Sequence, residues 1–273
     1  MTDEPFVVDV TITAPVGEVW DALRDPDLIR RWHGWHFDGL DEEIDVIYRK
    51  GAVESAGEYR LELQSNDVFE LTDLGDRTRL RLTRAPRGGD PQWDAYYDDI
   101  NEGWVTFVHQ LAFALERHPG ADRRTVFLSG AATTPVLEAA GLAAVAGADP
   151  GAYEVTGPAG EPLRGEVWFR SAHQIGLTVE GWGDGLLVVA ELPPSLTNPD
   201  GAGMMVLTTY GLGEAAFADL ESRWSAWWGR TFPAPAPVEG KDDPATDDSA
   251  TDDSVPHDPG SDGPAVHDPG SDG

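Results

Sequence analysis

Cysteine is absent from this 273-residue chain, and basic residues are few. Without a thiol, the chain can form neither a disulfide nor a thiolate metal site. Its 19 basic residues stand against 49 acidic ones, which gives a formal net charge of −30. Nucleic-acid backbones and anionic membrane surfaces are bound by basic patches. The charge balance therefore argues against both kinds of partner.

Long apolar runs are also missing. No stretch approaches the roughly 20 apolar residues of a membrane-spanning helix. The opening Met-Thr-Asp-Glu-Pro lacks the basic and apolar regions of a signal peptide. We therefore expect a cytoplasmic protein with no membrane partner. The hydrophobic content of 40% fits a globular protein with a sizeable core.

The C-terminal residues 233–273 differ from the rest of the chain in composition. They contain no Phe, Trp or Tyr, but eight prolines and eleven acidic residues. Ala-Thr-Asp-Asp-Ser occurs twice in this segment, and so does His-Asp-Pro-Gly-Ser-Asp-Gly. A segment with so little apolar surface cannot offset the entropy it would lose on ordering. We predict a disordered, acidic repeat tail.

The first part of the chain has the pattern of an α+β domain. An alternating strand ends near Ile12, and two short helices follow, beginning near Pro15 and Pro26. Four alternating runs then predict an antiparallel meander: Ile44–Tyr48, Tyr59–Leu63, Phe69–Leu71 and Leu80–Leu82. A long amphipathic helix is predicted over residues 93–118. Its apolar stripe must cover the concave face of the sheet, because no other element is available to bury it.

Particular residues in this part carry a family resemblance. The segment Thr11–Leu23 (TITAPVGEVWDAL), followed by Asp25-Pro26 and Trp32, resembles the opening of the START-like (SRPBCC) superfamily. The helix containing Glu102-Gly103-Trp104 is similar to the branch called activator of heat-shock-protein-90 ATPase homologue-like. The resemblance covers about residues 6–118. It implies a helix-grip (START-like/Bet v 1-like) fold, in which a curved antiparallel sheet wraps a long C-terminal helix around a cavity.

The sequence continues beyond this pattern, and the order of elements repeats. A strand near Thr125 leads to a helix over residues 135–145, four strand candidates follow, and an amphipathic helix rich in tryptophan closes the region. We therefore expect three parts: a START-like domain over 1–120, a degenerate second START-like copy over 121–232, and the tail over 233–273. The alternative is that the second region only extends the sheet of the first.

The densest cluster of candidate functional side chains is Trp32-His33-Gly34-Trp35-His36-Phe37. Its rings either line the mouth of a cavity or act as aromatic anchors beside solvent-facing histidines. Two neighbouring histidines without a third ligand do not predict a metal site. With the lining that the resemblance implies, the candidate ligand-binding residues are Trp32, Trp35, His36, Tyr48, Tyr59, Tyr97, Trp104, Val108 and His109.

Three hypotheses about function follow, and family members provide an example of each. The first is that the chain binds an apolar or aromatic small molecule in a hydrophobic cavity. The second is that it acts through its surface on a heat-shock-protein-90 homologue. The third is a polyketide cyclase-like enzyme. Since no known catalytic motif occurs, we favour binding, and we predict no catalytic residue, metal or cofactor.

Overall fold

The computed structural model describes residues 5–86, 97–131, 134–149, 151–194 and 201–232. The predicted tail over 233–273 lies outside these ranges. The two sheets described below belong to one compact unit. Within the described ranges, no helix is long and apolar enough to cross a membrane.

The N-terminal part of the chain forms a five-stranded antiparallel sheet with the spatial order β1-β5-β4-β3-β2. Its strands are β1 (Phe6–Ile12), β2 (Val53–Ser55), β3 (Arg60–Glu62), β4 (Asp67–Asp73) and β5 (Thr78–Arg84). Val8 pairs with Leu82, which also pairs with Phe69 on β4. All three side chains are buried, so this row forms one apolar face of the sheet.

The C-terminal part forms a six-stranded sheet with the order β6-β11-β10-β9-β8-β7. Its strands are β6 (Arg123–Ala131), β7 (Ala152–Thr156), β8 (Pro162–Arg170), β9 (Gln174–Val179), β10 (Gly185–Leu192) and β11 (Ala202–Tyr210). Strands β9 and β11 are buried along their whole length. The central part of this sheet is therefore covered on both faces, and β9, β10 and β11 are mainly apolar runs for that reason.

The helices divide between the two sheets. The first part contains α1 (Val16–Ala22), α2 (Pro26–Ile29), α3 (Leu40–Tyr48) and α5 (Tyr97–Arg117). The second contains α6 (Val136–Ala139), α7 (Ala143–Gly147) and α8 (Glu214–Thr231). Short 3₁₀ turns cover Ala56–Glu58 and Glu180–Trp182.

The two sheets have the same topology. In each, the first strand pairs with the last, and the remaining strands follow in reverse order along the chain. Short helices follow the first strand of each part, and a long helix closes each part. The fold is thus α+β with the helix-grip arrangement, and the repeated order is consistent with tandem copies. The predicted boundaries at residues 120 and 232 remain predictions.

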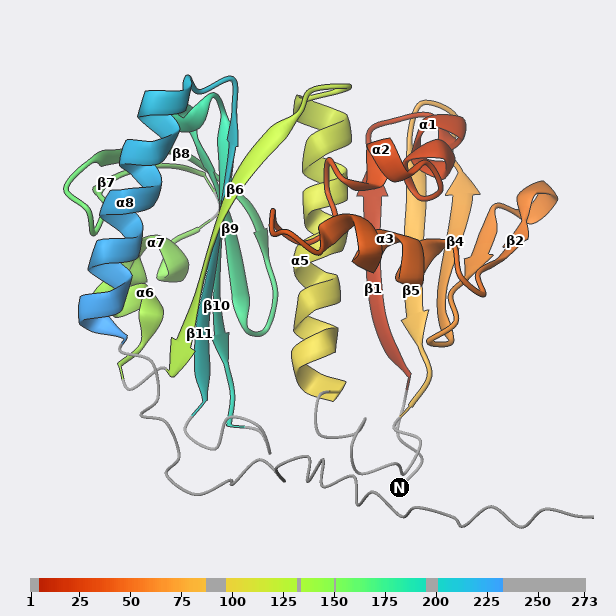
Figure 1. The fold of residues 1–273 in the computed structure, drawn as a ribbon, viewed down its shortest axis with the longest axis horizontal. Coiled ribbons are helices and arrows are strands. Elements are labelled where there is room, and N and C mark those ends of the chain that lie inside the picture. The colour runs from red at the N-terminus through yellow and green to blue at the C-terminus, as the bar shows by residue number, and fades with distance from the viewer. Residues whose placement is uncertain (1–4, 87–96, 132–133, 150, 195–200, 233–273) are drawn as a thin grey trace, which may run out of the picture. The chain divides into compact units, whose positions relative to one another are not determined.

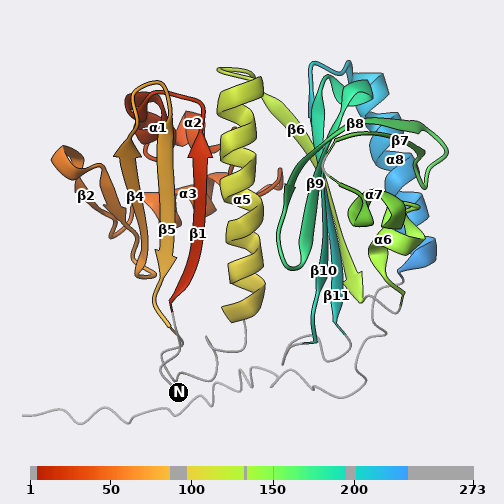
Figure 2. The same cartoon turned by 180° about the vertical axis from the view of Figure 1, so that it is seen from behind.

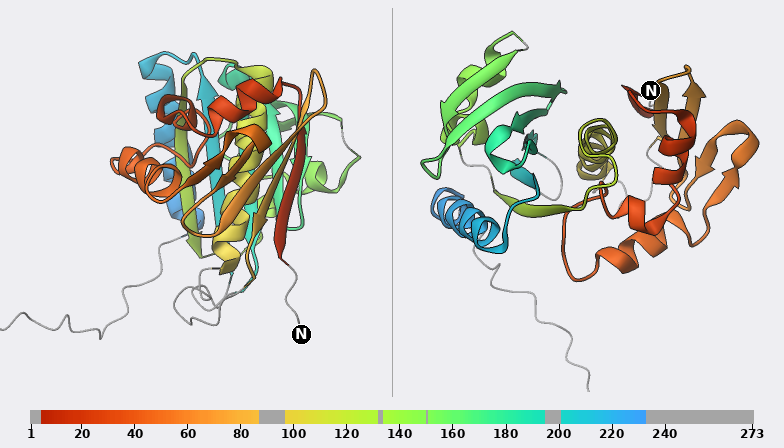
Figure 3. Two further views of the ribbon diagram at one scale, coloured as in Figure 1. Left: turned by 90° about the vertical axis from the view of Figure 1, so that its right-hand side faces the viewer. Right: turned by 90° about the horizontal axis from the view of Figure 1, so that it is seen from above.

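Helix α5 lies between the two sheets (Figures 1 and 2), and it contacts β1 on one side and β10 on the other. One core joins the first sheet and α5 to residues of the second sheet, among them Val188 and Val206. Their neighbours Leu187 and Leu207 face the opposite way, into a second core with α6, α7 and α8. The view from above in Figure 3 shows α5 between the sheets and α8 beyond the second one.

One strand prediction was wrong. The run Ile44-Val46-Tyr48 belongs to helix α3, not to a strand. Leu40, Ile44 and Tyr48 are buried at helical spacing, whereas Val46 is 49% exposed. Three acidic residues, Asp41, Glu42 and Glu43, occupy the first turn, where they stabilise the positive end of the helix dipole.

The helix predicted over 135–145 is also interrupted. Gly141 adopts a left-handed conformation (φ 72°) between α6 and α7. Glycine reaches this region without the steric penalty of a Cβ atom, so it ends α6 and redirects the chain. Strand β7 was not anticipated. The long helix is confirmed from Tyr97 onward, while its predicted start at 93 lies outside the described residues.

Candidate functional site

The candidate site begins at His33, just after α2. Asp25 caps α2 by accepting a hydrogen bond from the Asp27 amide at 2.9 Å. Next along the chain, the Trp32 indole donates to the Ala22 carbonyl at 2.9 Å, which anchors the segment against α1. The His33 side chain is thereby held in the interior, where it is 1% exposed.

His33 bridges two residues of α3. Its Nε2 lies 2.9 Å from a carboxylate oxygen of Glu43, and its Nδ1 lies 2.9 Å from the Tyr48 hydroxyl. Glu43 belongs to the first turn of α3 and Tyr48 is its last residue, so the imidazole connects the two ends of this short helix. We call Glu43, His33 and Tyr48 the relay. It runs from a carboxylate that is 38% exposed to a phenol that is 4% exposed.

Burial sets the ionisation of the relay. Desolvation lowers the pKa of His33, and this outweighs the opposing effect of Glu43. Desolvation also raises the pKa of Tyr48, with further contributions from Glu43 and Asp67. At neutral pH the imidazole and the phenol are therefore both uncharged.

Aromatic rings surround His33 and Tyr48. The His33 ring centroid lies 4.7 Å from that of Phe107 and 6.2 Å from that of Trp104. Trp32 contacts the Tyr48 ring edge-on at 5.7 Å. The cluster thus places two polar groups inside an aromatic environment between α3 and α5.

A buried carboxylate lies on the other side of Trp104. Asp67, which is 2% exposed, accepts hydrogen bonds from Arg84 Nε at 2.8 Å and from Trp104 Nε1 at 3.2 Å. Ser65 supplies a third donor at 2.8 Å. Burial nevertheless raises the pKa of Asp67, although these partners oppose the effect. Asp67 is fully engaged in binding protein groups.

The predicted residues Trp35 and His36 face the second sheet and lie outside the relay. The Trp35 ring stacks on Phe127 of β6, with centroids 3.5 Å apart. The His36 amide donates to the Thr125 hydroxyl at 2.7 Å, and its Nδ1 lies 3.0 Å from the same oxygen. Partial burial, together with the nearby Arg123 and Arg30, lowers the pKa of His36 to about 4.

The remaining candidates are dispersed. Tyr59 follows a 3₁₀ turn in a left-handed conformation and packs edge-on against Trp20 at 5.9 Å. Tyr97 donates its hydroxyl to the Ala85 carbonyl at 3.0 Å. Val108 is fully buried on α5. Of the nine predicted lining residues, Tyr48 belongs to the relay, and Trp32 and Trp104 pack beside it.

His109 belongs to the interface between α5 and the second sheet. Its ring stacks on Phe169 of β8, with centroids 3.8 Å apart and planes 3° from parallel. Burial lowers the pKa of His109 to about 4. The side chain is therefore neutral at pH 7 and serves as a packing residue.

We expect this histidine to make stability fall in mild acid. Because its folded pKa lies below the unfolded value near 6.5, only the unfolded chain gains a proton as the pH falls from about 6.5 to about 4. The loss amounts to about 3 kcal/mol at the lower limit. Urea unfolding at pH 7 and pH 4 should therefore show a shallower pH dependence for His109→Gln than for the wild type. Parallel losses in the two proteins would contradict this assignment.

A buried arginine joins the two parts of the fold. Arg123, at the start of β6, is 4% exposed, and burial lowers its pKa to about 10. Its guanidinium donates to Gln110 Oε1 at 2.6 Å and to the carbonyls of His33 at 2.6 Å and Gly34 at 3.1 Å. These acceptors are neutral, so Arg123 fixes the His33 segment by hydrogen bonds.

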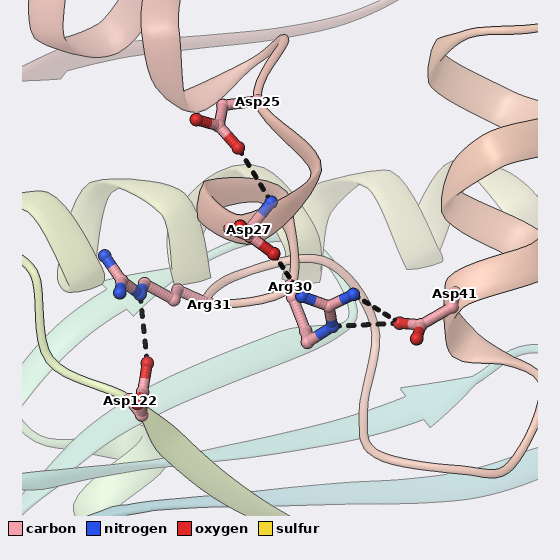
Figure 4. A network of polar contacts seen from close by, with 6 residues as sticks. All are labelled: Asp25, Asp27, Arg30, Arg31, Asp41 and Asp122. Atoms are coloured by element: carbon pink, nitrogen blue, oxygen red, sulfur yellow. Dashed lines mark hydrogen bonds and ion pairs between the residues drawn. The ribbon is translucent and has the colours of Figure 1, made fainter.

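A network of ion pairs at the surface stabilises the same segment (Figure 4). Arg30 lies between Asp27 and Asp41, each 2.7 Å away, and so connects α2 to the start of α3. Arg31 reaches Asp122, just before β6, at 3.1 Å. Exposed pairs contribute little individually, but here they flank the turn that carries His33.

A separate hollow of about 220 Å³ lies between α7 and β7. Small apolar side chains of α7 and the strand residues Tyr153, Val155 and Val167 line it. The Tyr153 hydroxyl points elsewhere, since it donates to the Thr178 carbonyl at 2.8 Å. None of the residues predicted from the sequence borders this hollow. Across the described ranges, no group of three or more His, Asp or Glu side chains could hold a metal ion.

Comparisons with known proteins add little to this geometry. Neither a family model nor a curated protein matches the chain. DynU16, a protein of the dynemicin biosynthetic locus, aligns at 19% identity and a TM-score of 0.28, covering 83% of this chain and 95% of its own.

Two further solved structures align over similar lengths. The di-domain ARO/CYC BexL of the BE-7585A biosynthetic pathway aligns at 12% identity and a TM-score of 0.30, covering 85% of this chain and 100% of its own. The di-domain ARO/CYC StfQ of the steffimycin biosynthetic pathway aligns at 13% identity and a TM-score of 0.31, covering 80% and 91%. At these scores, the matches carry no argument about what this chain binds.

Sequence reasoning missed the partners that organise the site. Glu43 and Asp67 looked like two of many acidic residues, and Arg123 like one of many arginines. No local pattern singles out Glu43, because residues five apart lie on different faces of a helix. Asp67 and Arg123 depend on contacts between residues distant in the sequence, so no local pattern could have identified them.

Proposed function

We propose that this protein binds an apolar or aromatic small molecule in the interior of its first helix-grip part. The observation that carries the proposal is the His33–Tyr48 hydrogen bond, 2.9 Å long and enclosed by aromatic rings. Ligand sites are mainly apolar and contain a few oriented polar groups. Here the rings supply the apolar surface and Tyr48 supplies the polar group.

The element that would admit a ligand is α3. It has only nine residues, and its outer face carries the exposed Val46. Because the rings behind α3 contact one another directly, a ligand reaches Tyr48 only when α3 shifts outward. The proposal therefore includes a small displacement of this helix on binding.

Native mass spectrometry on tagless protein from its own host tests the proposal. We expect a reproducible mass excess that disappears under denaturing conditions. The purified protein should also bind 2-methoxynaphthalene, detected by quenching of tryptophan fluorescence. A bare polypeptide mass combined with no response to this probe would refute the proposal.

A variant in the hollow beside α7 tests whether the ligand binds there instead of in the interior of the first part. Ala144→Phe fills that hollow, in which Ala144 is a lining residue. We expect unchanged binding of 2-methoxynaphthalene by this variant. Loss of binding would move the ligand site to the second part of the fold.

A second candidate function, a polyketide cyclase-like enzyme, is favoured by one observation. A carboxylate, an imidazole and a phenol in hydrogen-bonded series form an arrangement suited to acid–base chemistry. Turnover of a ligand identified by mass spectrometry, lost in Tyr48→Phe, would support catalysis. The surface role with a heat-shock-protein-90 homologue remains a prediction from the sequence alone.

A further inference from the structure

We propose that the relay makes the site selective for aromatic ligands that carry a hydroxyl group, because it leaves the Tyr48 oxygen free to accept a hydrogen bond. This inference rests on the proposed function and specifies the chemistry of the ligand. It follows from the direction of the two hydrogen bonds at His33.

The Glu43 carboxylate, at the solvent-exposed end of the relay, determines the direction of both hydrogen bonds. An ionised carboxylate only accepts hydrogen bonds, so the contact between Glu43 and His33 requires a proton on Nε2. A neutral imidazole carries one N–H, and the lone pair of Nδ1 therefore faces the Tyr48 hydroxyl. The Tyr48 hydroxyl consequently donates a hydrogen bond to Nδ1 of His33.

This donation determines what Tyr48 can offer a ligand. Its only O–H is engaged with Nδ1, while its oxygen retains a lone pair. Among the described residues, no other group donates a hydrogen bond to this oxygen. The hydroxyl already has one partner in Nδ1, and a ligand hydroxyl would donate to its remaining lone pair.

The surrounding polar groups do not offer an alternative anchor. Asp67 is occupied by Arg84, Trp104 and Ser65. The Trp104 indole N–H is used in the same network, and the Trp32 indole binds the Ala22 carbonyl. The Tyr48 oxygen is therefore the acceptor that remains available beside the rings.

The test compares two naphthalene ligands: 2-naphthol carries a hydroxyl donor, and in 2-methoxynaphthalene a methyl group replaces the donor proton. We expect the wild type to bind 2-naphthol about tenfold more tightly than 2-methoxynaphthalene, as one additional hydrogen bond allows. Tyr48→Phe should bind both probes with the affinity that the wild type has for 2-methoxynaphthalene. The substitution removes one oxygen and preserves the ring.

Glu43 acts as a positioning residue, and histidine ¹⁵N chemical shifts report its effect. In the wild type, we expect His33 to be protonated at Nε2. Glu43→Met removes the acceptor at the solvent end, so His33 should become a mixture of tautomers and the preference for 2-naphthol should decrease. Glu43→Gln retains an acceptor oxygen and should preserve both the tautomer and the preference.

The outcomes separate the two levels of the proposal. If neither probe binds to the wild type, this inference fails, and the proposed function fails with it when native mass spectrometry also shows a bare polypeptide. If both bind equally, or if the preference persists in Tyr48→Phe, ligand binding stands and the selectivity is refuted. A wild-type His33 protonated at Nδ1 would also overturn the inference, without relying on any variant.

Discussion

Arg123→Met is expected to destabilise the protein by about 3 kcal/mol or more, through loss of hydrogen bonds at the junction of the two parts. The substitution keeps an apolar side chain of similar length but removes the hydrogen bonds to Gln110 and to the carbonyls of His33 and Gly34. Gln110 and Gly34 keep only longer contacts, from Thr208 and from the Gln110 amide, both at 3.4 Å. A hydrogen bond to a charged group contributes about 1.5–3 kcal/mol. Urea unfolding at pH 7 would measure the loss.

Arg31→Met is the matched control. Arg31 also reaches across to the second part, but its partner Asp122 is 89% exposed. An exposed ion pair contributes about 1 kcal/mol at most. Equal destabilisation by the two substitutions would show that burial of Arg123 does not distinguish it from a surface residue.

Trp104→Ala is expected to cost about 3–5 kcal/mol, the range for truncating a large buried aromatic side chain. Trp104 is 4% exposed and contacts Phe69 edge-on at 5.5 Å and Tyr48 at 6.5 Å. The truncation leaves a cavity in the main core and removes the indole N–H from Asp67. Chemical denaturation would measure the change in unfolding free energy.

Trp104→Phe separates the contribution of core packing from that of the hydrogen bond to Asp67. It retains an aromatic ring and most of the apolar volume, and it removes the N–H from which Asp67 accepts a hydrogen bond at 3.2 Å. We expect a loss of about 1–3 kcal/mol, since Asp67 keeps its bonds to Arg84 and Ser65. If the Phe and Ala variants were equally unstable, the hydrogen bond rather than the packing would dominate.

Local sequence patterns predicted most of the elements but misread α3. Ile44, Val46 and Tyr48 alternate as strand residues do, and the same segment places Leu40, Ile44 and Tyr48 on one helical face. A short apolar run fits both the two-residue period of a strand and the 3.6-residue period of a helix. The three acidic residues at the start of the segment favour a helix, and the buried face settles the assignment.

Site prediction was limited by long-range contacts. Tyr48 was expected in the interior as a strand residue, and it lies there as a helix residue hydrogen-bonded to His33. Trp35 and His109 were expected around one cavity, yet each stacks on a phenylalanine of the second sheet. Their positions depend on how that sheet packs against α5, which no pattern within the first part reveals.

The position of α5 has a consequence for the independence of the two halves. One side of this helix carries Trp104, and other positions present Thr106, His109 and Phe113 to the second sheet. Removing either sheet would expose one of these two sides of α5 to water. We therefore expect the two sheets to unfold together in a single cooperative transition, as one folding unit.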